Sequence, residues 1–155
     1  MPIAKRDPDF LKTLERMHQD SKILFEKGEY YNCCYLCGYV LECALKFLLC
    51  RFGKKIDGEP YTWQDVKKHQ HKLSKLNQEL EECLSITEGI PPQYRLDSLR
   101  NCPYIFSGRE GYSHWDPGFR YGECPAWDSR PYCEHYMEES EYVFRFIGRI
   151  IAGGE

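Results

Sequence analysis

The sequence predicts an all-α protein: an up-down bundle of four main helices with an aromatic-rich irregular insertion before the last helix. Two observations predict this fold. Apolar residues recur at helical spacing in four segments, and no stretch shows sustained alternation of a β-strand. The 155 residues are enough for one domain with a sizeable core, so residues 1–155 are expected to form a single helical domain.

The segment 30–52 is predicted to be the central helix, because it is apolar on nearly every face. Glu42 and Lys46 lie four residues apart in it and share one face. Gly38 interrupts the segment and indicates close approach of another helix, since a mid-helix glycine otherwise costs roughly 1 kcal/mol. The longest uncharged run covers only residues 30–41, against about 20 residues for a membrane span, so we expect no membrane helix.

Three further helices are expected to cover the central one. The first spans about 8–27, with Asp7 as N-cap and Pro8 at the first position, and packs antiparallel to the central helix. The second spans about 62–84, capped by Thr62, with a basic strip formed by Lys68, His71, Lys72 and Lys75. The last spans about 130–151, and its core face is expected to hold Tyr132, Tyr136, Val143, Phe146 or Ile147, and Ile150.

Residues 85–129 form the irregular insertion, in which prolines and glycines alternate with large aromatic residues. It carries too much apolar surface for a loose linker, and a long loop in a compact domain is usually functional. A short helix is expected around residues 93–101.

Composition restricts the function. The chain has 21 basic and 24 acidic residues, a net charge of −3, so a site for a polyanion must be a local patch. The first ten residues contain no apolar signal segment, which favours a cytoplasmic protein whose nine cysteines are reduced. Cys124, Cys133 and His135, with Cys102, were weighed as zinc ligands, but structural zinc needs about four closed ligands, and we predict neither a metal nor a cofactor.

The chain resembles the HEPN family of small all-α domains over about residues 10–150. The resemblance rests on the order and spacing of four runs: Gly28-Glu-Tyr-Tyr, Gly38-Tyr-Val-Leu-Glu42-Cys-Ala-Leu-Lys46, His71-Lys-Leu-Ser-Lys-Leu76 and Trp115-Asp-Pro-Gly-Phe-Arg120-Tyr121, followed by a long helix. It implies a homodimeric helical bundle that acts on RNA or nucleotides, often beside a nucleotidyltransferase partner in a toxin–antitoxin or defence system.

The family's catalytic signature is an arginine and a histidine with four to six residues between them, near the start of the last long helix. Arg130 and His135 match it, and Arg109 and His114 are the alternative pair. A guanidinium can neutralise a phosphate, and a histidine can transfer a proton to or from a ribose hydroxyl. On this interpretation the protein is a metal-independent endoribonuclease with its site at a dimer interface.

The other interpretation, which we rank slightly first, is a non-catalytic domain that binds RNA, a nucleotide or a partner protein. The candidate binding residues are Glu42, Lys46, His71, Trp115, Arg120 and Tyr121, with the basic strip. By the resemblance, Glu42 is a recurrent polar position of the bundle core that bonds Arg120 or His71. Trp115 and Tyr121 also suit a purely structural role, in which they fix the insertion to the bundle.

Overall fold

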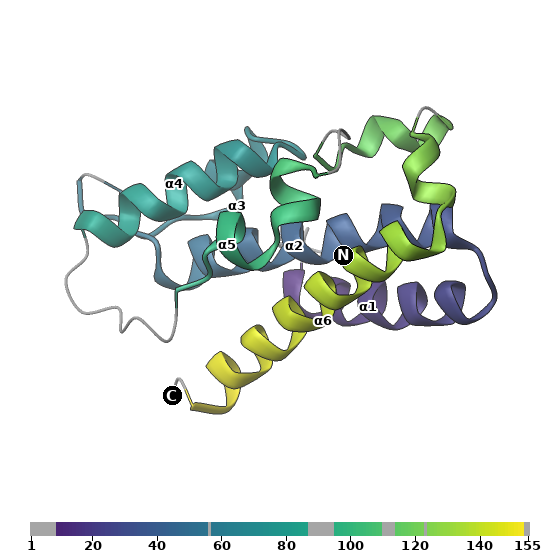
Figure 1. Cartoon of the computed structure of the whole chain (residues 1–155). Coiled ribbons are helices and arrows are strands. Elements are labelled where there is room, and N and C mark those ends of the chain that lie inside the picture. The colour runs from purple at the N-terminus through teal and green to yellow at the C-terminus, as the bar shows by residue number, and fades with distance from the viewer. Residues whose placement is uncertain (1–8, 56, 87–94, 110–113, 123, 154–155) are drawn as a thin grey trace, which may run out of the picture.

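The computed structural model describes residues 9–55, 57–86, 95–109, 114–122 and 124–153, and these residues contain helices but no β-strand (Figure 1). The all-α prediction is therefore confirmed. In chain order the elements are α1 (Phe10–Glu26), α2 (Tyr30–Phe52), α3 (Trp63–Lys67), α4 (Leu73–Ile86), α5 (Ser98–Asn101), the π-helix η2 (Pro103–Ser107), the 3₁₀-helices η3 (Pro117–Tyr121) and η4 (Pro125–Asp128), and α6 (Arg130–Gly153).

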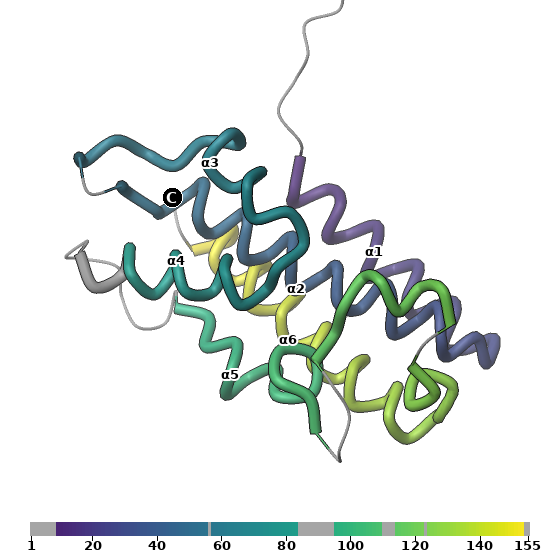
Figure 2. The backbone as a smooth tube through the Cα atoms, turned by 90° about the horizontal axis from the view of Figure 1, so that it is seen from above, coloured from purple at the N-terminus to yellow at the C-terminus, as the bar shows by residue number. Residues whose placement is uncertain are grey.

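Helix α2 is the centre of the structure, as its apolar sequence predicts. It contacts α1, α4 and α6, and its buried residues form the middle of the hydrophobic core (Figures 1 and 2). Among the described residues it is the one helix long and apolar enough to cross a membrane, and most of it is buried within the bundle. Burial by other helices accounts for its apolar character.

Helix α1 begins later than predicted. The Asp9 side chain accepts a hydrogen bond from the Lys12 backbone N–H at 3.0 Å, so Asp9 is the N-cap and Phe10 the first helical residue. The predicted cap, Asp7-Pro8, lies outside the described residues. The chain then turns at Gly28, whose φ of +78° is readily adopted by glycine, and enters α2.

The single helix predicted over 62–84 is wrong, because the structure has two helices there. Thr62 is the expected N-cap and forms a capping box with Asp65, but α3 ends at Lys67 and α4 begins only at Leu73. Between them the backbone turns at Gln70, whose φ of +51° is unusual for a residue with a side chain. The break also divides the predicted basic strip, since Lys68 lies before the turn, 3.9 Å from Glu79, whereas Lys75 lies within α4.

The insertion is folded onto the bundle, as its apolar content predicts. The expected short helix is present as α5, capped by Asp97, while residues 87–94 lie outside the described residues. The Tyr31 hydroxyl of α2 donates to the Phe119 carbonyl and accepts from the Cys124 N–H. The Glu139 carboxylate of α6 accepts from two backbone N–H groups of η2. The insertion is therefore held from both long helices.

Helix α6 presents the core face that its spacing predicts. Tyr132, Tyr136, Val143, Phe146, Ile147 and Ile150 are all buried. Its far side is joined to α1, because His18 Nε2 lies 2.6 Å from Glu141 Oε2. The first and last long helices therefore contact each other as well as α2.

None of the nine cysteines, all of which lie in the described residues, forms a disulfide, and eight are buried while Cys50 is half-buried. Burial raises the pKa of the Cys43 thiol to about 12 and also raises the pKa of Cys34, Cys37 and Cys102. Since the thiolate is the reactive form, we expect native protein to react promptly with a disulfide reagent such as DTNB at no more than one thiol per chain. All nine should react in denaturant. Cys50→Ser should abolish the prompt reaction, and prompt reaction of several thiols would contradict this burial.

Candidate functional site

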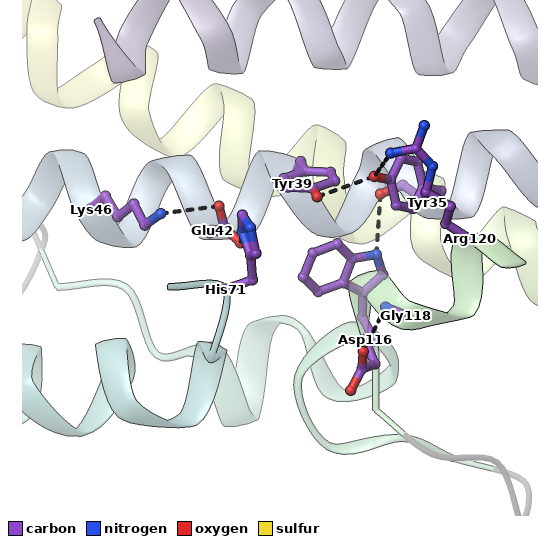
Figure 3. A network of polar contacts seen from close by, with 9 residues as sticks. Tyr35, Tyr39, Glu42, Lys46, His71, Asp116, Gly118 and Arg120 are labelled. Atoms are coloured by element: carbon purple, nitrogen blue, oxygen red, sulfur yellow. Dashed lines mark hydrogen bonds and ion pairs between the residues drawn. The ribbon is translucent and has the colours of Figure 1, made fainter. Parts of the chain in front are cut away.

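A row of polar side chains follows one side of α2 (Figure 3). Tyr35, Tyr39, Glu42 and Lys46 recur at intervals of three or four residues, which places them on one face of a helix. This face meets the turn before α4 and the segment that leads into η3. The polar row is thus the surface on which the central helix meets the insertion.

Glu42 is the most enclosed charge of this row. It is 4% exposed, and its two carboxylate oxygens have different partners: Oε1 lies 2.8 Å from His71 Nδ1, and Oε2 accepts from Lys46 Nζ at 3.2 Å. Lys46 is 6% exposed and also lies near the Phe10 and Trp63 rings. A buried carboxylate needs such pairing, and His71 is one of the two partners expected for Glu42.

Trp115 occupies the middle of the row. Its indole N–H donates to the Tyr35 carbonyl at 3.1 Å, and its backbone N–H donates to the Ile105 carbonyl at 2.8 Å. The indole lies directly over Gly38, so that a Cβ at that position would overlap the ring. Gly38 was expected to admit another helix, and the structure corrects this: it admits the side chain of Trp115.

Arg120 and Tyr121 lie at the other end of the row from Lys46. The Arg120 guanidinium is 3.5 Å from the Tyr35 hydroxyl and close to the rings of both Tyr35 and Tyr121. Tyr121 is 81% exposed, so it does not act as a buried structural anchor. Tyr39 links this end to the other, because its hydroxyl is 3.1 Å from that of Tyr35 and its ring contacts His71 edge-on.

Burial raises the pKa of the Tyr39 hydroxyl, and its hydrogen bond with Tyr35 raises it further. Tyr39 therefore stays protonated and serves as a neutral spacer between the Glu42 group and Arg120. The row consequently has two charged ends and an uncharged aromatic middle.

A cleft of about 450 Å³ opens beside this row. One wall is formed by residues 70–74 and the other by Phe106 with residues 114–117. His71, Lys72 and His114 line it, as does Asp116, whose carboxylate already accepts a hydrogen bond from the Gly118 N–H at 2.7 Å. The strained turn at Gln70 forms part of the same wall, and such backbone strain is commonly found at functional sites.

No family model, curated protein or solved structure matches the chain. The candidate site is therefore judged on its own geometry.

The described contacts do not bring Arg130 and His135 together. Arg130 is the first residue of α6, where its Nε bonds Glu134 at 3.1 Å and its guanidinium lies over the Phe25 ring. His135 is half-buried and stacks on Tyr104, with ring centroids 4.0 Å apart. Positions five apart on a helix point about 140° from each other, and Arg130 is already helical. A joint site would need a second subunit.

No described contact brings the alternative pair, Arg109 and His114, together either. Arg109 is exposed and its charge acts on Glu139, whereas His114 lines the cleft. Residues 110–113 between them lie outside the described residues. The thiols weighed for zinc are buried, and no group of three or more histidine, cysteine or acidic residues in the described part of the chain is placed to hold a metal ion.

Sequence reasoning missed Tyr35, Tyr39 and Phe106, whereas Lys72 was among the candidate binding residues as part of the basic strip. The helical spacing of the two tyrosines with Glu42 and Lys46 was a usable signal. The cleft itself could not be predicted from the sequence, because its walls come from segments that are about 40 residues apart in the chain and meet only in the fold.

Proposed function

We propose that this protein is a cytoplasmic HEPN-type domain that binds single-stranded RNA through a nucleotide subsite in the 70–74/114–117 cleft. The observation that carries the proposal is the set of nitrogen-bearing side chains on the cleft walls, His71, Lys72 and His114, beside the exposed pair Arg120 and Tyr121. The RNA class comes from the family resemblance. The resemblance also supports a homodimer, an up-down four-helix arrangement and a nucleotidyltransferase partner as parts of the same proposal.

Phosphate binding suits the cleft despite the net charge of −3. The nearby carboxylates are already engaged, Glu42 by His71 and Lys46, and Asp116 by the Gly118 N–H. Lys72 is exposed on the wall and is free to approach an anion. Lys46, Lys72 and Arg120 are the cations of the row and cleft, and Glu42 and Asp116 are the anions, so the local balance is more positive than that of the whole chain, as a polyanion site requires.

Base stacking suits the exposed end of the row. The Tyr121 ring is 81% exposed, and the Arg120 guanidinium beside it is a second flat surface that also carries a positive charge. Aromatic platforms of this kind bind unpaired bases with little sequence preference. A single-stranded ligand could place a phosphate in the cleft and a base on Tyr121.

The second candidate, an endoribonuclease using Arg130 and His135, stays a prediction. It needs these residues from two subunits to face one cleft, and in a single chain His135 is stacked on Tyr104 and Arg130 is paired with Glu134.

Binding of a fluorescein-labelled, fully 2′-O-methylated RNA strand, followed by fluorescence anisotropy, tests the proposal without cleavage. We expect Tyr121→Ala to weaken binding by roughly tenfold through the loss of one stacked base, and Lys72→Ala to weaken it and reduce its salt dependence. Lys12→Ala is the matched control, because Lys12 is an exposed lysine on α1, which packs against α2 away from the cleft. Equal binding by all four proteins, or no binding by the wild type, would refute the proposal.

A further inference from the structure

The pairing of His71 with Glu42 fixes both the position and the tautomer of a histidine in the cleft. The carboxylate is buried and held on its other oxygen by Lys46, so its position is fixed. Because a carboxylate accepts, its 2.8 Å contact with His71 Nδ1 places the imidazole proton on that nitrogen. The neutral ring then has its lone pair on Nε2. The His71 side chain is 49% exposed and lines the cleft, so Nε2 is available to a ligand.

A buried carboxylate that fixes the tautomer of a half-exposed histidine is the arrangement by which a general base is oriented. The Tyr39 ring contacts His71 edge-on at 5.6 Å between centroids and further restricts the imidazole. The other wall supplies a second imidazole, His114, and the first wall supplies the Lys72 ammonium. One cleft thus contains three groups: an oriented base, a second imidazole that can donate a proton, and an ammonium cation.

We infer that this cleft is an acid–base catalytic site that cleaves the RNA strand bound there, with His71 as general base, His114 as general acid and Glu42 as a positioning residue. The inference rests on the proposed RNA binding. It assigns a different site from the Arg130/His135 pair, and it uses residues from α2, the turn before α4 and the insertion.

The reaction needs only proton transfers within the cleft. His71 Nε2 takes the proton from the ribose 2′-hydroxyl, and the 2′-oxygen forms a bond to the adjacent phosphorus. The bond from phosphorus to the 5′-oxygen breaks, and His114 in its protonated form donates a proton to that oxygen. The products are a 2′,3′-cyclic phosphate and a 5′-hydroxyl, while Lys72 stabilises the charge on the non-bridging oxygens.

A DNA strand with a single ribonucleotide tests the inference, with an all-DNA strand as the uncleavable match. Incubation in EDTA should cut the first strand after its ribonucleotide and leave the second intact, and mass spectrometry should find the cyclic phosphate. We expect His71→Ala and His114→Ala each to lower the cleavage rate by roughly 10² to 10⁴. His114→Ala removes an exposed side chain and should not disturb folding, whereas His71→Ala leaves the buried Glu42 carboxylate with Lys46 alone, so urea unfolding must show that this variant is folded.

Glu42→Gln tests whether Glu42 orients His71 or only stabilises the fold. The glutamine amide can donate to Nδ1 and so favours the tautomer with the proton on Nε2, which cannot act as a base. We expect cleavage at least tenfold slower and a displaced limb of the pH–rate profile at saturating substrate. Urea unfolding of the variant, followed by circular dichroism, checks that it remains folded.

The outcomes separate the inference from the proposed function. Binding of the methylated strand without cleavage of the ribonucleotide-containing strand would overturn the catalytic inference and leave RNA binding intact. Cleavage that survives His71→Ala but is lost in His135→Ala would also overturn it and would favour the Arg130/His135 site. Failure of the wild type to bind either strand would refute the proposed function itself.

Discussion

Gly38→Ala is expected to destabilise the protein by about 3 kcal/mol, close to the loss of a buried tryptophan side chain. The usual effect has the opposite sign, because alanine inside a helix is more stable than glycine by up to about 1 kcal/mol. Here the new methyl group would overlap the Trp115 indole, which is 1% exposed and bonded to the Tyr35 carbonyl. The indole cannot move aside without losing that bond and its burial.

Two controls sharpen this prediction, with the free energy of unfolding measured in urea. In a Trp115→Ala background the space over Gly38 is empty, so Gly38→Ala should become stabilising by about 0.5 to 1 kcal/mol. Gly148→Ala should be stabilising in the wild type, because a Cβ there meets nothing within 4 Å. A destabilisation by Gly38→Ala that persists without Trp115 would show that the indole is not the cause.

Removing the Glu139 carboxylate is the second change with a large expected effect. Glu139 is 7% exposed, and its two oxygens accept from the Tyr104 and Ile105 N–H groups, each at 2.9 Å. Glu139→Ala would leave both N–H groups without this partner, at roughly 1–3 kcal/mol each, so we expect a loss of about 2 to 6 kcal/mol in unfolding free energy. Urea unfolding at constant pH measures it, and a loss below about 1 kcal/mol would mean that water replaces the carboxylate.

The same carboxylate makes stability depend on pH. Burial raises the pKa of Glu139 to about 7, against the opposing effect of the two N–H donors. A group whose pKa is higher in the folded state stabilises the fold below its unfolded value near 4.5, and this contribution is lost as the pH rises through about 7. Glu139→Gln does not titrate at this position. The free energy of unfolding of the wild type, relative to that variant, should therefore fall as the pH rises from about 4.5 to about 7. A difference that grows with pH instead would mean that the N–H bonds outweigh burial.

The parts of the fold that follow from local patterns could be predicted from the sequence. The continuous apolar character of residues 30–52 identified the central helix, and the spacing from Tyr132 to Ile150 identified the core face of α6. The pairing of Glu42 with His71 was one of two partnerships that the family resemblance implied. The two helices depend on residues close in sequence, and their apolar patterns were therefore enough to identify them.

The remainder depends on contacts between distant segments. The run from Lys67 to Lys72 has no apolar residue to show whether it continues a helix, and the turn at Gln70 positions His71 toward Glu42. Gly38 signalled a close approach, but glycine spacing cannot distinguish a helix from an indole. Only the fold shows that Trp115 fills this space and that His114 and His71 line the same cleft.

The packing of Trp115 on α2 determines how late the cleft can form while the chain is being synthesised. The indole bonds a carbonyl 80 positions earlier in the chain, and Tyr31 bonds residues still further along. Helices α1 and α2 are neighbours in sequence and can pair as soon as both leave the ribosome, whereas contacts over such separations close late. Until residues 114–117 emerge, the growing chain has one wall of the cleft and an open slot above Gly38. On the proposed function, a partly synthesised chain would therefore lack the RNA site, and completion of the cleft would coincide with the late steps of folding.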